Sequence, residues 1–191
     1  DSVAELTIGL AIAALRNIPC NDLNLRTGKW RRLEGMELRG QKVGVVGCGH
    51  IGSKVARLFK AFGCDLSICD LKPLPNLCEE LGAKQKSLED LLRSSDITTL
   101  HVPLTERTAN FLNADRFAIM KKEGLLINTS RGGVIDELAL VEALDRGSVG
   151  GACLDVFSLE PLVNPRLQTH ERVILSPHVG ARSEEHTSEL Q

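Results

Sequence analysis

The chain has 191 residues, of which 42% are hydrophobic, and a net charge of −2 at neutral pH. This composition is typical of a globular protein with a real core, and its slightly acidic balance excludes a nucleic-acid surface built on basic residues. The apolar run over 6–15 is too short for a membrane span, and no basic segment precedes it. The six cysteines show neither a C-x-x-C pair nor zinc-ligand spacing. We therefore expect reduced thiols in a cytoplasmic protein, with no metal site.

The first predicted element is a helix over 2–17. It is apolar on most sides, so we expect it to be buried against another domain or subunit. Ser2 and Glu5 fit a capping box at its start, and Pro19 helps to end it. Residues 18–40 are mixed and polar, which predicts a connecting segment.

From residue 41 onward, short apolar strands alternate with helical segments such as 137–146, which Gly147 follows. Apolar strands without polar alternation are typical of strands buried on both faces of a parallel sheet. The pattern predicts an α/β fold: a Rossmann-type, doubly wound parallel sheet with helices on both faces. The strands are expected at 43–46, 65–69, 97–102, 124–128, 151–155 and 172–175.

The first of these strands runs directly into a glycine-rich turn and a helix, an order that is typical of dinucleotide-binding sites. Gly47 permits the tight turn, Gly49 lets the backbone approach a pyrophosphate, and Gly52 lets the helix pack close to the strand. The helix N-terminus at His50 and Ile51 adds unpaired N–H groups and a partial positive charge for phosphates. Helical spacing places apolar residues on one face of this helix, namely Ile51, Val55, Leu58, Phe59 and Phe62.

Asp70 ends the second strand, about 20 residues beyond the glycine-rich turn, where the acid that contacts the ribose is expected. A carboxylate accepts hydrogen bonds from a free 2′-hydroxyl and repels a 2′-phosphate, so NAD is favoured over NADP. Lys72 could soften that preference. The alternative interpretation of Asp70 is a solvated turn aspartate.

Ligands of doubly wound sheets bind outside the carboxyl ends of the strands, so the residues after each strand are site candidates. His178 is the natural general acid/base, and Glu160 could bond its other ring nitrogen. Arg131 offers a planar fork for a carboxylate, and Gly132 and Gly133 leave room for a ligand beside it.

Asp155 could hold the carboxamide of a nicotinamide. A carboxylate anchor, an acid/base and a dinucleotide together suggest hydride transfer to or from a 2-hydroxy acid. Taken singly, each residue has an ordinary explanation, such as a loop histidine, a surface ion pair or a turn cap. Their occurrence together at successive strand ends favours a catalytic site.

These motifs resemble those of the D-isomer-specific 2-hydroxyacid dehydrogenases, with the 3-phosphoglycerate dehydrogenase and glycerate/hydroxypyruvate reductase branches most similar. The resemblance covers about residues 2–181. It rests on the glycine-rich motif, His101-Val102-Pro103-Leu104-Thr105, Asn128-Thr129-Ser130-Arg131-Gly132-Gly133, Asp155-Val156-Phe157-Ser158-Leu159-Glu160-Pro161 and Pro177-His178-Val179-Gly180.

The resemblance implies that Arg131, Glu160 and His178 match the catalytic Arg, Glu and His of the family. It also implies that Asp70 matches the family's adenosine-ribose acid. Further NAD contacts are implied at Val102, Pro103, Thr129, Ser130, Arg131, Asp155 and His178.

The family has a separate substrate-binding domain, which the resemblance implies is missing here, and is typically dimeric through the segment that matches 2–40. Both ends of the chain look cut. We expect an interdomain helix and connecting segment at 1–40 and an NAD-binding domain at 41–181. Residues 182–191 resemble the translation of a sequencing adapter and are expected to be a scar.

The intact parent is therefore expected to be a homodimer that acts on a small 2-hydroxy or 2-oxo acid, without nucleic-acid or membrane partners. Three alternatives stay open. NAD(H)-sensing corepressors resemble the same family and can keep the Arg, Glu and His, so these residues do not separate the two classes. Formate dehydrogenase relatives have Gln before the proline, so Glu160 argues against that branch. The last alternative is an inactive fragment of the enzyme.

Overall fold

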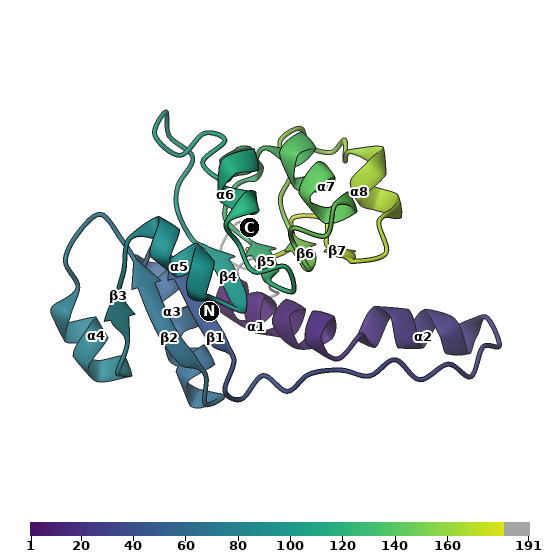
Figure 1. Cartoon of the computed structure of the whole chain (residues 1–191), viewed down its shortest axis with the longest axis horizontal. Helices are drawn as coiled ribbons and strands as arrows, with labels where there is room; N and C mark the ends of the chain where they lie inside the picture. Colours follow the sequence, from purple (N-terminus) through teal and green to yellow (C-terminus); the bar gives the residue numbers. More distant parts are fainter. Residues whose placement is uncertain (182–191) are drawn as a thin grey trace, which may run out of the picture.

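The computed structural model describes residues 1–181, so the expected scar at 182–191 lies outside the described residues. The centre of the fold is a seven-stranded sheet in the order β3-β2-β1-β4-β5-β6-β7 (Figure 1). All its neighbouring strands are parallel, which confirms the expected doubly wound arrangement. The strands are β1 (Lys42–Val46), β2 (Asp65–Cys69), β3 (Lys84–Gln85), β4 (Ile97–Leu100), β5 (Leu125–Asn128), β6 (Gly151–Leu154) and β7 (Val173–Leu175).

The central strands are buried on both faces. Every residue of β4 and β5 is buried, as their continuous apolar runs predict. The six predicted strands are confirmed, with ends that differ from the expected ones by no more than about two residues. The sequence pattern does not predict β3, because its two residues are exposed at the edge of the sheet and carry no apolar signal.

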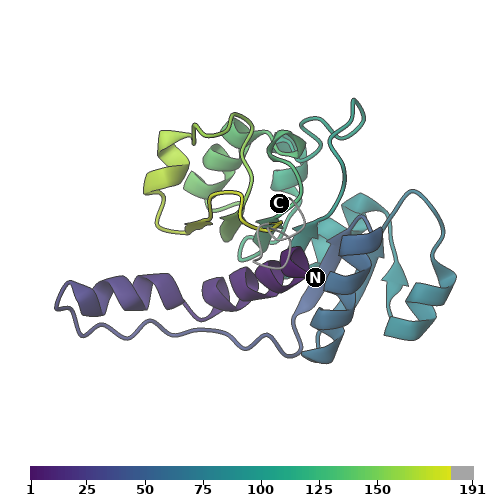
Figure 2. The same cartoon turned by 180° about the vertical axis from the view of Figure 1, so that it is seen from behind.

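Helices cover both faces of the sheet (Figures 1 and 2). On one face α1 and α3 pack over a core that includes Val55 and Phe59. On the other face α5, α6 and α7 pack over a second core that includes Leu91, Phe117 and Leu140. The helices are α1 (Ser2–Leu15), α2 (Ile18–Arg26), α3 (His50–Ala61), α4 (Pro75–Leu81), α5 (Leu88–Ser94), α6 (Ala114–Ala118), α7 (Glu137–Asp145) and α8 (Pro165–Thr169), with a 3₁₀ turn at Gly132–Val134.

Helix α1 differs from its prediction at both ends. It stops at Leu15, and its N-cap is Asp1, without a side-chain capping bond. The expected capping box of Ser2 and Glu5 is therefore wrong, because Ser2 already lies in the helix. The apolar sides of α1 are buried against α3, β5 and β6, so this domain itself supplies the cover expected from another domain or subunit.

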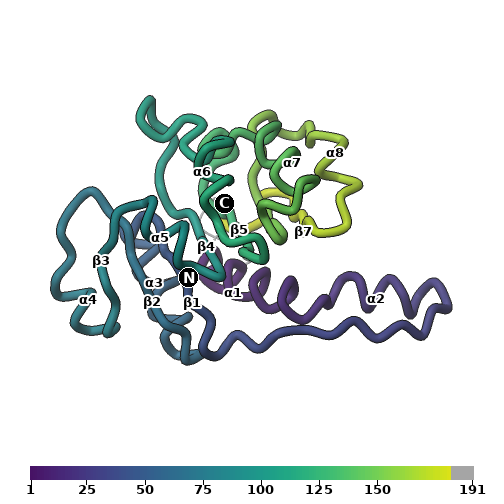
Figure 3. Tube along the Cα trace, viewed as in Figure 1, coloured from purple at the N-terminus to yellow at the C-terminus, as the bar shows by residue number. Residues whose placement is uncertain are grey.

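Residues 18–37 form an arm, made of α2 and the extended segment that returns beside it, and the arm projects from the body of the domain (Figure 3). The predicted linker is thus partly wrong. Asn17 turns the chain with a left-handed φ of 51°, and Pro19 lies in the first turn of α2, where proline is tolerated. Pro19 therefore begins a helix rather than ending one. No residue of α2 is buried, and five large apolar side chains of the arm are at least 49% exposed: Ile18, Leu23, Leu25, Trp30 and Met36.

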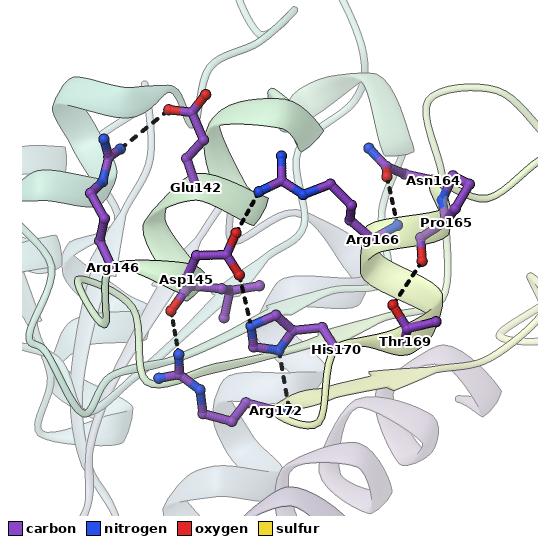
Figure 4. A network of polar contacts seen from close by, with 10 residues as sticks. Glu142, Asp145, Arg146, Asn164, Pro165, Arg166, Thr169, His170 and Arg172 are labelled. Atoms are coloured by element: carbon purple, nitrogen blue, oxygen red, sulfur yellow. Dashed lines mark hydrogen bonds and ion pairs between the residues drawn. The ribbon is translucent and has the colours of Figure 1, made fainter.

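A polar network joins α7, α8 and β7 (Figure 4). Asp145 at the end of α7 pairs with Arg166 of α8 and lies 3.7 Å from His170 Nε2. The Arg172 backbone N–H donates to His170 Nδ1 over 3.1 Å, and the Arg172 guanidinium donates to the Leu144 carbonyl. Most of these ion pairs are exposed, so each contributes little stability. Together they hold the start of β7, the strand that leads to the last loop of the site.

All six cysteines are free thiols. Burial raises the pKa of Cys48 and of Cys153 to about 12, so both are protonated at neutral pH. Within residues 1–181, no single helix is long and apolar enough to cross a membrane. In this described part of the chain, one pair of helices, α1 and α2, reaches the necessary length and composition, and that pair is bent by 60°.

The buried face of α3 matches the prediction in its middle, where Val55 and Phe59 are fully buried and Leu58 packs against the core, but not at its ends. Ile51 and Phe62 are 41% and 43% exposed. The face that packs on the sheet consists of Gly52, Val55, Ala56 and Phe59. Glycine and alanine carry little apolar signal, so the prediction missed Gly52 and Ala56 and included the larger residues Ile51 and Phe62 at the two ends of the helix.

We predict that Gly52→Ala lowers the free energy of unfolding by about 3 kcal/mol, because a Cβ at Gly52 would lie 1.9 Å from the Gly47 carbonyl oxygen. Gly9→Ala in α1 is the matched control, since a Cβ there meets nothing within 4 Å. Alanine is favoured over glycine in helices by about 1 kcal/mol, so Gly9→Ala should stabilise the chain. Urea unfolding followed by circular dichroism measures both variants, and equal stability of the two would contradict the close packing of α3.

Candidate active site at the carboxyl edge of the sheet

The candidate residues lie on loops that leave one edge of the sheet. All strands are parallel, so their carboxyl ends share that edge. The glycine-rich turn and Asp70 follow β1 and β2, and the segment from His101 follows β4. The segments that contain Arg131, Glu160 and His178 follow β5, β6 and β7.

The glycine-rich turn forms an open cradle at the start of α3. Gly47 has a φ of 85°, and its N–H donates to the Cys69 carbonyl over 2.8 Å. A Cβ at Gly49 would meet no atom within 4 Å, so the backbone is open to a ligand there. His50 and Ile51 are the exposed first residues of α3, whose first turn contains no acidic residue. This environment suits an anion such as a pyrophosphate.

Asp70 is bonded to the backbone on two sides. Its Oδ2 accepts the Cys48 N–H over 2.7 Å, and its Oδ1 accepts the Lys72 N–H over 3.1 Å. The bond to Lys72 closes a turn, as expected if Asp70 is a turn aspartate. The bond to Cys48 holds the carboxylate against the glycine-rich turn. A carboxylate has about four lone-pair directions, so acceptor capacity is left for ribose hydroxyls. Recognition of the ribose by Asp70 stays a prediction.

The segment after β4 packs directly on the glycine-rich turn. A Cβ at Gly47 would lie 2.6 Å from the His101 carbonyl oxygen and 2.8 Å from Val102 Cγ1. Val102 therefore flanks the glycine-rich turn, and the NAD contacts of Val102 and Pro103 stay predictions. His101 Nε2 lies 2.9 Å from Thr99 Oγ1, and burial lowers the pKa of His101 to about 4. Its imidazole is neutral at pH 7.

Asn128 organises the loop that contains Arg131, a role that was not predicted from the sequence. This fully buried residue accepts the Ser130 N–H over 3.0 Å and the Ser130 hydroxyl over 2.8 Å at Oδ1. Its Nδ2 donates to the Arg131 carbonyl over 3.0 Å. The Arg131 side chain is exposed and donates to the Ser130 carbonyl over 2.7 Å. The available signal was a polar residue at the end of an otherwise apolar strand.

Gly132 and Gly133 do not leave room for a ligand, contrary to expectation. A Cβ at Gly132 would lie 1.9 Å from the Phe157 carbonyl carbon. At Gly133 it would lie 3.1 Å from Leu104 Cδ2. Both glycines let loops of neighbouring strands pack against each other, so the space they leave is filled by protein.

Glu160 and His178 form a hydrogen-bonded pair, with 2.7 Å between Glu160 Oε2 and His178 Nδ1. Glu160 Oε1 also accepts the Phe157 N–H over 3.1 Å. The hydrogen bond with His178 lowers the pKa of Glu160, and the Phe157 N–H and the positive charge of Arg131 lower it further. The pair lines an open hollow of about 400 Å³ with Phe157, Pro161, Val163, Pro177 and Ala181.

Asp155 is almost fully buried and holds the turn that contains His178. Its carboxylate accepts the Ser176 hydroxyl over 2.6 Å, the Val179 N–H over 3.0 Å and the Gly180 N–H over 2.9 Å. His178 has a φ of 52°, which is uncommon for a residue other than glycine. The carboxylate thus fixes the backbone beside His178, while Glu160 fixes its ring. The expected contact of Asp155 with a nicotinamide carboxamide stays a prediction.

The structure therefore brings the expected residues together as two groups. In the first group the glycine-rich turn lies next to Asp70, which accepts the Cys48 N–H, and next to Val102, and the backbone at Gly49 is open. This arrangement is compatible with a dinucleotide. Arg131, Glu160 and His178 form the second group, a cation beside a carboxylate–imidazole pair. Such a group can bind an organic acid and move a proton. The parallel sheet with a glycine-rich turn after its first strand defines the fold as that of a dinucleotide-binding domain.

Comparison with known proteins identifies the family. The model of the D-isomer specific 2-hydroxyacid dehydrogenase NAD binding domain matches residues 8–180, and the chain belongs to this family. The expected family, the Rossmann-type fold and NAD as the cofactor are thereby confirmed.

Similar proteins include the D-3-phosphoglycerate dehydrogenase of Methanocaldococcus jannaschii, 43% identical over 96% of this chain and 36% of its own length. The glyoxylate reductase of Aeropyrum pernix is 41% identical over 97% of this chain and 58% of its own length. Among solved structures, a D-lactate dehydrogenase of Aquifex aeolicus complexed with NAD and lactic acid has a TM-score of 0.91 and 30% identity, over 100% of this chain and 62% of that one. The chain thus spans about a third to three fifths of the length of these relatives.

We predict that His101 makes the domain less stable in acid. Its pKa is about 4 in the fold against an ordinary value of 6.5, so the unfolded chain binds a proton first as the pH falls. Stability is therefore lost between about pH 6.5 and pH 4, by roughly 3 kcal/mol at most. His101→Gln should flatten this part of the profile, measured by urea midpoints from pH 7 to pH 4. His50→Gln, on the exposed start of α3, is the control, and parallel profiles for wild type and His101→Gln would refute the prediction.

Proposed function

We propose that this chain is the NAD-binding part of a longer NAD-dependent dehydrogenase that acts on the CH–OH group of a D-2-hydroxy acid. In this proposal residues 41–181 are the NAD-binding domain, 1–40 connect it to a separate substrate domain, and 182–191 are foreign. The observation that carries the proposal is the Glu160–His178 pair within the electrostatic reach of Arg131, at the edge that also holds the dinucleotide cradle.

His178 is the proton carrier in this proposal. The Glu160 carboxylate can only accept a hydrogen bond, so His178 Nδ1 is the donor and Nε2 is left as the base. Nε2 takes the substrate hydroxyl proton during oxidation and returns it during reduction, and Glu160 stabilises the imidazolium in between. NAD, when bound, supplies the hydride acceptor. Arg131 binds the substrate carboxylate in its planar fork and polarises the carbonyl.

The substrate in this proposal is a small 2-hydroxy or 2-oxo acid. The names of two relatives, D-3-phosphoglycerate dehydrogenase and glyoxylate reductase, both denote enzymes of such acids. The hollow beside His178 is open and has apolar side chains on its walls, so a second domain is needed to enclose a substrate there. Enclosure would strengthen the interactions of Arg131 and Glu160 by removing water.

We also propose that the protein is a cytoplasmic homodimer joined through the arm and α1. A nine-residue helix such as α2, with no buried residue, is too short to be stable in isolation. The exposed apolar side chains of the arm would gain cover from a second copy. The free thiols suit a reducing compartment.

We predict that the 191-residue chain binds NADH at least about tenfold more tightly than NADPH, because Asp70 repels a 2′-phosphate. Asp70→Asn should abolish this difference, since it removes the charge but keeps an oxygen that can accept the Cys48 N–H. Titrations that follow nicotinamide fluorescence measure both affinities. Equal binding of the two cofactors by the wild type would remove Asp70 from the proposed site.

We predict that His178→Ala and Arg131→Ala each lower kcat/KM about 10²- to 10⁴-fold in the full-length enzyme, while NADH affinity stays within about threefold. His170→Ala is the control, since His170 belongs to the network around Asp145 and not to the site. Steady-state assays with D-2-hydroxy and 2-oxo acids measure the effect. Near-normal turnover of either site variant would refute its role, and NADH binding without any turnover by the wild type would favour a sensing module.

A further inference from the structure

Thr7 is a fully buried polar residue in the largely apolar helix α1. Its Oγ1 lies 3.0 Å from the Oγ1 of Thr129, in the loop between β5 and the 3₁₀ turn. Thr129 is also buried. Two buried hydroxyls that contact each other across separate elements are a specific polar contact, because each needs a partner to offset the loss of water.

The direction of this hydrogen bond follows from the number of protons. Thr7 Oγ1 lies 2.8 Å from the Val3 carbonyl oxygen, which can only accept, so the single hydroxyl proton of Thr7 is donated there. The hydroxyl of Thr129 must therefore donate to Thr7. The resulting chain runs from Thr129 through Thr7 to the backbone of α1.

Thr7 completes the attachment of the loop that presents Arg131. Within residues 1–181, the side chain of Asn128 bonds Ser130 and Arg131 but not Thr129, which lies among them. Asn128 thus holds the loop from the end of β5, whereas Thr7 holds it from the side of α1.

The same part of α1 also touches the turn that contains His178. A Cβ at Gly180 would lie 3.4 Å from Leu6 Cδ2 and 3.5 Å from Val3 Cγ2. The first turns of α1 therefore lie against both loops of the site. Thr7 makes the polar contact between α1 and the loop that contains Thr129.

We propose that Thr7 is a positioning residue: its hydroxyl holds Thr129 in place and thereby sets the position of Arg131 and of the cofactor-facing backbone. This inference deepens the proposed function and rests on it, because the position of Arg131 matters for activity only if Arg131 binds the substrate. Thr7 touches neither substrate nor cofactor in this proposal and acts only through Thr129.

Thr7→Val tests the proposal, because valine keeps the shape of the side chain and removes the hydroxyl. We expect the 191-residue chain with this change to bind NADH about tenfold more weakly, and Thr7→Ser to restore binding to within about twofold. The double variant Thr7→Val/Thr129→Val should bind no more weakly than Thr129→Val alone, because both changes remove the same bond.

Thr98→Val is the matched control. Thr98 is buried in β4, and among the described residues its hydroxyl has no hydrogen-bond partner. Its replacement by valine should leave NADH affinity and stability unchanged or improved. A general sensitivity of the domain to Thr→Val changes in its core would show in this variant as well.

Amide hydrogen exchange without cofactor separates this proposal from the proposed function. We expect Thr7→Val to speed exchange at the Ser130 N–H about tenfold, and Thr7→Ser and Thr98→Val to leave it unchanged. If Thr7→Val speeds exchange but the wild-type chain binds no NADH, the role of Thr7 in holding the loop is supported and the proposed cofactor site is refuted. Wild-type exchange and NADH affinity in a folded Thr7→Val variant, or no rescue by serine, would overturn the proposal.

Discussion

Two buried polar side chains at the ends of neighbouring strands need hydrogen-bond partners, and the geometry of the site depends on this need. Asn128 ends β5, Asp155 follows β6, and the Asp155 N–H donates to the Asn128 carbonyl over 3.0 Å. An amide or a carboxylate buried without partners costs several kcal/mol, so each must take its partners from the loop beside it. Asn128 thereby shapes the backbone up to Arg131, and Asp155 the turn around His178. The need of these two buried side chains for hydrogen-bond partners thus orders the loops of the candidate active site.

Arg131, Glu160 and His178 themselves lie on the surface. The side chains of His178 and Glu160 are 44% and 36% exposed, and an ion pair in such a position contributes little to stability in water. The hydrogen bond with His178 is the main cause that lowers the pKa of Glu160, and the charge of Arg131 contributes less. These residues are therefore placed by the buried residues beneath them and not by their own attraction. Such an arrangement suits a site whose electrostatic strength develops only when a second domain excludes water, as we propose.

The sequence predicted the parts of the fold that have a strong local signal. Continuous apolar runs marked six strands, and the spacing of Gly47, Gly49 and Gly52 marked the turn before α3. It failed where the signal is weak or tertiary: β3 is short and exposed, and the buried face of α3 is built on Gly52 and Ala56 rather than Ile51. The left-handed conformation of Asn17 and the close contact of Gly132 with Phe157 depend on chain geometry that local patterns do not record. Residue types at strand ends indicated the candidate site. The supporting role of Asn128 had only a weak sequence signal, a polar residue at the end of an apolar strand, and the role of Thr7 is visible only as a contact.

Helix α1 connects the arm, the proposed dimer contact, with the loops of the candidate active site. Its first turns contact the loops that contain Thr129 and Gly180, and its last turn carries the arm, where the Leu15 carbonyl accepts the Met36 N–H over 2.9 Å. A buried helix moves as a rigid element, so a displacement of α1 at the arm would also displace its first turns at the site. Coupling between the two would also require a second arrangement of α1, with a different free energy when a second copy is bound. Because α1 is packed on α3, β5 and β6, such an arrangement must repack part of the core, and this packing favours a fixed geometry at the site.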